Sequence, residues 1–164
     1  ICNTLNQSLD FFNMPKPKLI IEPGRAITGP AGVAIYSVGA IKNIENVRKY
    51  IAVDGGMGDN IRPALYGAKY EAVVINRLWD ERPKEKVTIV GKYCESGDIL
   101  IKDILLPEIK SGDILAIPVS GAYSTSMASN YNMNPRPVII SVKDGMDSII
   151  RKRESLSDLF KMDV

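Results

Sequence analysis

The run Lys86-Val87-Thr88-Ile89-Val90-Gly91, the turn Cys94-Glu95-Ser96-Gly97-Asp98 and the run Asp98-Ile99-Leu100-Ile101 decide the expected fold. The outer runs are rich in β-branched residues, and the glycine-containing turn is short enough to join them as neighbouring strands. The turn also carries a thiol and carboxylates, which are typical of a site and not of a core. The sequence therefore predicts strands that present reactive side chains where they connect.

Similar short apolar runs continue on both sides of this stretch, each bounded by turn residues. They predict further strands at 18–22, 32–41, 49–54, 71–76, 113–117, 136–142 and 146–151. Helical spacing and capping residues predict short helices at 1–12, 60–66 and 155–160. A charged loop is expected around 80–83, and an irregular loop or short helix with a specific role or a packing role at 124–134. This series predicts a mainly β fold, an antiparallel Greek-key-like barrel or sandwich with short helices.

Composition narrows the class of protein. The chain has 164 residues, of which 45% are hydrophobic and 24% charged, as expected of a soluble globular domain. The net charge of +2 arises from interspersed basic and acidic residues, so neither a nucleic-acid face nor a membrane anchor is expected. Two cysteines form no disulfide framework, and the expected location is the cytoplasm. The absence of histidine argues against a Ser-His-Asp triad and a typical zinc site, and no metal is expected.

Cys94 has two interpretations. A cysteine at the end of a strand is often a half-buried, small apolar residue. Carboxylates at Glu95 and Asp98 instead disfavour a thiolate and favour a thiol that holds a proton and donates it. Glu95 can equally be a solvated turn acid, and Asp98 can be a turn former before the next strand.

The motif Glu22-Pro23-Gly24-Arg25 follows the predicted buried strand at 18–22. In β/α architectures, ligands bind at the carboxyl ends of strands. Gly24 allows backbone N–H groups to approach an anion, and Arg25 offers a planar fork for a carboxylate or phosphate. The alternative is a plain turn with a surface arginine.

Arg62 and Tyr66 lie one helical turn apart in the predicted helix at 60–66. They can share a face that binds a carboxylate, or they can form a simple packing pair. Tyr123, after Gly121-Ala122, can present its hydroxyl to a phosphate or be a core tyrosine with a satisfied hydroxyl. The glycines at 55, 56 and 58 match neither the dinucleotide fingerprint nor the Walker A pattern, so they indicate a tight strand-to-helix turn.

Taken in order, these motifs resemble the C-terminal half of the diaminopimelate decarboxylases, which are pyridoxal-phosphate enzymes of the alanine racemase-like, fold type III group. The resemblance extends from about Leu19 to Val164. It implies pyridoxal 5'-phosphate as cofactor and meso-diaminopimelate as substrate, with L-lysine and carbon dioxide as products. It also implies a cytoplasmic homodimer.

The resemblance implies roles for the motif residues. Glu22, Gly24 and Arg25 belong to the cofactor-binding motif, in which Gly24 and Arg25 supply backbone donors to the phosphate and Arg25 also contacts the substrate carboxylate. Arg62 and Tyr66 are implied to bind the substrate carboxylate, and Tyr123 to contact both cofactor and substrate. Cys94 is implied to be the proton donor, reaching the active site from the other subunit of the homodimer. Glu95 is implied to recognise the distal amino end.

In the family that this chain resembles, the Schiff-base lysine and the histidine that stacks on the cofactor lie on an N-terminal barrel, and no lysine here sits in the matching motif. The resemblance therefore implies that residues 1–25 are the last helix and strand of a β/α barrel and that residues 26–164 are the C-terminal β domain. We expect the chain to be inactive without the N-terminal barrel half. Alternatives are a related decarboxylase of another diamino acid or polyamine precursor, and a noncatalytic β domain that acts in assembly.

Overall fold

The computed structural model describes residues 1–77 and 82–164, so the expected charged loop at 80–83 lies partly outside the described residues. The helices in this part of the chain are α1 (Cys2–Phe11), α2 (Arg25–Thr28) and α3 (Arg62–Tyr66), and the 3-10 turns are η1 (Gly29–Ala31), η2 (Tyr131–Met133) and η3 (Leu156–Phe160). The strands are β1 (Ala34–Ile44), β2 (Arg48–Val53), β3 (Val73–Val74), β4 (Lys84–Val90), β5 (Ile99–Pro107), β6 (Ile114–Ile117), β7 (Ile139–Lys143) and β8 (Met146–Arg151). None of these helices is long and apolar enough to cross a bilayer.

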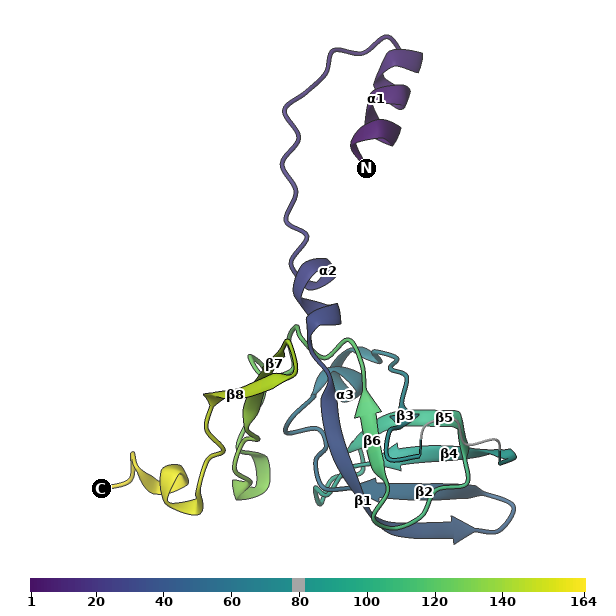
Figure 1. Cartoon of the computed structure of the whole chain (residues 1–164), viewed down its shortest axis with the longest axis vertical. Helices are drawn as coiled ribbons and strands as arrows, with labels where there is room; N and C mark the ends of the chain where they lie inside the picture. The colour runs from purple at the N-terminus through teal and green to yellow at the C-terminus, as the bar shows by residue number, and fades with distance from the viewer. Residues whose placement is uncertain (78–81) are drawn as a thin grey trace.

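The main sheet has the strand order β3-β6-β1-β2-β4-β5. Its neighbouring strands are antiparallel, except that β2 and β4 run parallel with Ile51 opposite Ile89. The end strands β3 and β5 contact each other, so the sheet curls into a nearly closed barrel (Figure 1). The prediction of a mainly β, barrel-like fold is confirmed, and the parallel pair is the exception to its antiparallel character.

The core lies inside this curled sheet. Ile51 of β2, Ile89 of β4 and Leu115 of β6 are completely buried, and the neighbouring buried residues are also β-branched or aliphatic, apart from Tyr36. Such side chains fit the pleated, crowded interior of a small barrel. The core is supplied by most of the runs that predicted strands, but not by those at 18–22, 136–142 and 146–151.

The C-terminal segment forms a separate hairpin of β7 and β8 beside the barrel (Figure 1). Asp144 and Gly145 both have positive φ, 53° and 77°, as a two-residue hairpin turn requires. Beyond the hairpin, Ser155 and Asp158 form a capping box at the start of η3. The hairpin, its turn and the capped final turn confirm the predictions for this region.

The N-terminal segment extends away from the barrel, with α1 at its far end (Figure 1). The helix prediction for 1–12 is confirmed, but the prediction of a strand at 18–22 is wrong, because these residues form no ladder. Leu19, Ile20 and Ile21 are exposed. A strand exists only where a neighbouring strand accepts and donates its backbone hydrogen bonds, and no described strand of this chain lies beside the segment.

Gly121 lies where the turn after β6 crosses the chain that leads from α2 into β1. Its N–H donates to the carbonyl of Gly29 at 3.0 Å, and a Cβ at this position would lie 1.9 Å from the carbonyl oxygen of Thr28. We expect Gly121→Ala to destabilise the protein by about 1–3 kcal/mol, because backbone must move to make room. Urea unfolding followed by circular dichroism measures this loss.

Gly39→Ala is the matched control for this substitution. The added Cβ would meet only the carbonyl oxygen of Ala52, at an ordinary 3.7 Å. Its unfolding midpoint should stay close to that of the unsubstituted protein. Equal midpoints for the two variants would contradict the close crossing at Gly121.

Candidate functional site

A cavity of about 410 Å³ opens between the start of α2 and α3. Its lining comes from three places in the sequence, namely Arg25 at the start of α2, the segment 62–71 around α3, and the turn after β6. The lining residues are Arg25, Arg62, Tyr66, Ala68, Lys69, Tyr70, Glu71, Pro118 and Val119. The cavity thus joins the predicted site residues Arg25, Arg62 and Tyr66.

Arg62 is the central cation of this cavity. Its guanidinium carbon lies 5.4 Å from the centre of the Tyr66 ring and 5.3 Å from that of the Tyr123 ring. Both distances are within the range of a cation–π contact. Its Nε is buried without a hydrogen-bond partner among the described residues. A buried donor on a permanent cation is costly unless an acceptor reaches it, so Arg62 is prepared for an anionic ligand.

The local sequence explains why Arg62 lies there. Pro63 occupies the first turn of α3, where its missing N–H costs nothing, and Gly67 ends the helix in the left-handed region with φ 62°. The side-chain oxygen of Asn60 accepts the N–H of Arg62 at 3.3 Å. The short helix therefore places Arg62 and Tyr66 on the same face.

Tyr123 reaches the same place from the turn after β6. Its backbone has φ 62°, and Val119 a few residues earlier has φ 59°. For a bulky or β-branched residue this conformation is strained, and such strain concentrates at functional sites. A Cβ added to Gly24, whose φ is 31°, would lie 3.8 Å from the Tyr123 hydroxyl. Gly24 and Tyr123 are therefore close neighbours at the edge of the cavity.

The charges around the cavity favour an anion. Arg25, Arg62 and Lys69 line it, against a single carboxylate from Glu71. Guanidinium groups bind carboxylates and phosphates through paired hydrogen bonds. Lys69 was not predicted from the sequence, because an isolated surface lysine gives no signal there.

The Cys94 turn forms a second group of predicted residues. Cys94 is exposed, and so is Glu95. The Glu95 Oε1 accepts the N–H of Gly97 at 3.2 Å and the hydroxyl of Ser96 at 3.3 Å, and its Oε2 accepts the hydroxyl of Tyr131 at 3.3 Å. These bonds, that from Gly97 foremost, lower the pKa of the Glu95 carboxyl. The turn therefore presents a thiol next to a carboxylate held in its charged form.

Asp98 connects this turn to the glycine-rich loop that leads to α3. Its buried carboxylate accepts the N–H of Met57 at 2.7 Å and the N–H of Tyr93 at 2.9 Å. Lys92 N–H also donates to the carbonyl of Gly55 at 2.9 Å. Burial raises the pKa of the Asp98 carboxyl, and the two N–H donors oppose that rise. Asp98 is thus a structural connector between the two motif loops.

All the predicted residues except Glu22 fall into two groups in one chain. Gly24, Arg25, Arg62, Tyr66 and Tyr123 gather at the cavity. Cys94 and Glu95 do not line it, and Glu22 is exposed outside its lining. Tyr131, which sequence reasoning had not selected, contacts Glu95; the polar character of 124–134 was the only signal for it.

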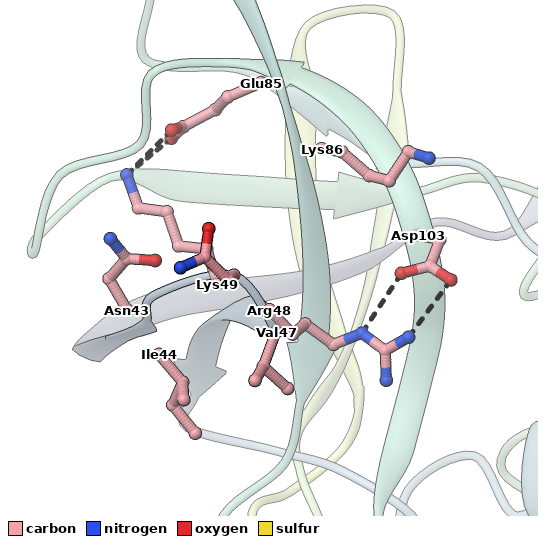
Figure 2. Close-up of a pocket in the computed structure, with 9 residues that line it drawn as sticks. Asn43, Ile44, Val47, Arg48, Lys49, Glu85, Lys86 and Asp103 are labelled. Carbon is pink, nitrogen blue, oxygen red and sulfur yellow. Dashed lines mark hydrogen bonds and ion pairs between the residues drawn. The ribbon is translucent and has the colours of Figure 1, made fainter.

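A second cavity, of about 400 Å³, lies at the ends of β1, β2 and β4 (Figure 2). Its main charges already have partners: Lys49 pairs with Glu85 at 2.7 Å, and Arg48 with Asp103 at 3.1 Å, as Figure 2 shows. Within each pair the two charges offset each other, which leaves Lys86, among the described lining residues, as the one cation outside these two pairs. No cluster of metal-ligating side chains is present among the described residues. The first cavity is therefore the better candidate site.

The fold and these motifs define the class of protein. Residues 19–121 match the family model described as pyridoxal-dependent decarboxylase, C-terminal sheet domain, and the chain belongs to this family.

Particular relatives narrow this class. The chain is 49% identical over its full length to the diaminopimelate decarboxylase of Bacillus subtilis (strain 168), and it covers 37% of that protein. Among solved structures it is similar to diaminopimelate decarboxylase from M. jannaschii in complex with L-lysine, with a TM-score of 0.85, 37% identity, and coverage of 98% of this chain and 36% of that one. Similarity to the lysine/ornithine decarboxylase of Vibrio vulnificus is lower, with a TM-score of 0.67, 26% identity, and coverage of 82% and 36%. The chain thus spans little more than a third of the curated relative's length.

Proposed function

We propose that this chain is the C-terminal part of a pyridoxal-phosphate-dependent diaminopimelate decarboxylase, which converts meso-2,6-diaminopimelate to L-lysine and carbon dioxide. The observation that carries the proposal is Arg62, which lies beside the rings of Tyr66 and Tyr123 and whose buried Nε has no hydrogen-bond partner among the described residues. The identity of 49% to a diaminopimelate decarboxylase, against 26% to a lysine/ornithine decarboxylase, supports this substrate over related ones.

The residues at the cavity fit pyridoxal phosphate. Gly24, without a side chain and with a positive φ, leaves room for an anion beside the Tyr123 hydroxyl. We infer that Gly24, Arg25 and Tyr123 would hold the phosphate, with Glu22 in the same motif. When bound, this cofactor supplies the electron sink for the electron pair that remains when carbon dioxide leaves.

Arg25, Arg62 and Tyr66 would bind and orient a substrate carboxylate. The cation–π contacts hold the Arg62 guanidinium in place before the substrate arrives, so little conformational entropy is lost on binding. Lys69 adds positive charge at the same cavity.

Cys94 would donate its thiol proton to the carbon that has lost the carboxylate, and Glu95 would bind the distal ammonium group. Because neither residue lines the cavity that contains Arg62, we propose that they serve the active site of the other subunit in a homodimer. Each site would then combine Arg62 of one subunit with Cys94 of its partner.

Residues 1–25 would be the last helix and strand of a β/α barrel, and 26–164 the C-terminal β domain. The exposed Ile20 and Ile21 in the extended segment support this division, because such side chains need neighbours to cover them. The barrel would also carry the lysine that anchors the cofactor, and the chain would be inactive without it.

Mixed dimers test the shared site directly. Arg62→Ala and Cys94→Ala would be introduced separately into the complete enzyme, and each should be nearly inactive. Co-expression of the two variants with different tags should restore roughly a quarter of the activity, because half of the randomly formed dimers are mixed and each has one intact site. Release of carbon dioxide from meso-diaminopimelate measures the recovery, and L-lysine and L-ornithine serve as comparison substrates.

Absence of recovery in purified mixed dimers would place Arg62 and Cys94 in one subunit's site and overturn the shared-site proposal. Faster release from L-lysine or L-ornithine than from meso-diaminopimelate by the unsubstituted enzyme would overturn the proposed substrate.

A further inference from the structure

Glu95 lies on an exposed turn, yet both of its carboxylate oxygens accept hydrogen bonds. Ser96 and Gly97 bond to Oε1 from within the turn, whereas Oε2 accepts the hydroxyl of Tyr131, 36 residues further along the chain. The hydrogen bonds from within the turn therefore reach only Oε1 of the carboxylate. The tyrosine is therefore the contact that fixes the rotation of the carboxylate.

Tyr131 is itself held in place. Its ring packs against that of Tyr93, with centroids 5.9 Å apart, and Tyr93 is buried at the base of the Cys94 turn. The turn that carries it is closed by the Met133 N–H, which donates to the Asn130 carbonyl at 2.9 Å. The Asn130 side chain donates to Glu154 at 2.7 Å, which anchors the turn to the C-terminal segment.

The loop that leads to Tyr131 begins at the cavity that contains Arg62. Tyr123 at its start contacts Arg62, and in its middle the Ser129 N–H donates to the Gly58 carbonyl at 2.9 Å. The polar segment 124–134 thus connects Tyr123 at the cavity to Tyr131, which bonds to Glu95. Between these two tyrosines, the segment is hydrogen-bonded to the glycine-rich loop. This gives the segment a role beyond connecting strands.

We propose that Tyr131 is a positioning residue that orients Glu95 toward the distal ammonium group of the substrate, and so selects amino acids with a charged amine at their far end. The proposal rests on the proposed function, in which Glu95 recognises that group. An exposed glutamate samples several rotamers, whereas one held at both oxygens meets an ammonium ion without further ordering. The hydrogen bonds also lower the pKa of Glu95, which keeps its charge.

Tyr131→Phe in the complete enzyme tests this role, because phenylalanine retains the ring packing on Tyr93 and removes only the hydroxyl. The KM for meso-diaminopimelate should rise about tenfold, as for loss of a hydrogen bond to a charged group, while kcat changes less than about twofold. The KM for 2-aminopimelate, which lacks the distal amine, should not change. The selectivity between the two substrates should therefore fall about tenfold.

Glu95→Gln separates this inference from the proposed function, and Tyr50→Phe on β2 is the matched control that should change neither KM. If Glu95→Gln leaves the KM for meso-diaminopimelate unchanged, the proposed role of Glu95 fails. If Glu95→Gln raises that KM but Tyr131→Phe does not, only the Tyr131 inference is overturned. The Tyr131 inference would also be overturned if Tyr131→Phe lowered kcat for both substrates and lowered the thermal stability of the enzyme, because that result indicates a packing role. In the Glu95→Gln background, Tyr131→Phe should have no further effect on selectivity.

Discussion

Replacement of Cys94 by alanine in the complete enzyme is expected to lower the rate of lysine formation by about 100-fold or more, the usual contribution of a positioned general acid. Alanine removes the only proton that this side chain can donate and leaves the carboxylate-binding residues intact. The KM for meso-diaminopimelate should therefore change little. Chromatographic measurement of lysine at saturating substrate gives the rate of the step that needs the proton.

Cys2→Ala is the matched control, because Cys2 is also an exposed, free cysteine but lies on α1. It should leave lysine formation unchanged. If the Cys94 variant keeps lysine formation within a few-fold of the original rate, the proton comes from another group and the role of Cys94 is refuted.

The second large effect is expected at Asp98. Asp98→Ala leaves the N–H groups of Met57 and Tyr93 without their buried acceptor, which costs about 1–3 kcal/mol each. Relief of the desolvation of the carboxylate offsets part of this cost. The free energy of unfolding should therefore fall by about 2–4 kcal/mol, as measured by urea unfolding of the complete enzyme.

Two further variants bracket this prediction. Asp98→Asn keeps one oxygen acceptor and should lose about half as much stability. Asp147→Ala, at an exposed position on β8, should lose almost none. If alanine at 98 and alanine at 147 cost the same, Asp98 does not connect the two loops as described.

Many of the strands could be predicted because they follow local rules. β8 was expected at 146–151 and spans Met146–Arg151, since Asp144 and Gly145 demand a tight turn just before it. The final helical turn with Ser155 as its cap was likewise predictable from a few adjacent residues. In contrast, the parallel pairing of β2 with β4 depends on contacts between distant segments, and no local pattern specifies it.

The grouping of residues at the candidate site was predictable in part for the same reason. The cavity unites Arg25, Arg62 and Tyr66 as sequence reasoning selected them, because each lies in a short motif with a turn residue beside it. Asp98 was balanced between a chemical and a structural role, and only burial with two backbone donors decides for the structural one. The contact of Tyr131 with Glu95 joins residues far apart in sequence, so spacing could not reveal it.

The tight fit around Asp98 also has an evolutionary and engineering consequence. A side chain at Gly56 or Gly91 would meet the Asp98 carboxylate at 2.5 Å or 2.2 Å, and Gly56 has a φ of 152°. None of these three positions can change alone without overlap or lost hydrogen bonds, so each single mutational step away from this arrangement is expected to cost stability. Directed evolution toward new substrates should therefore leave this trio untouched and diversify the exposed periphery, where each replacement can be accepted one at a time.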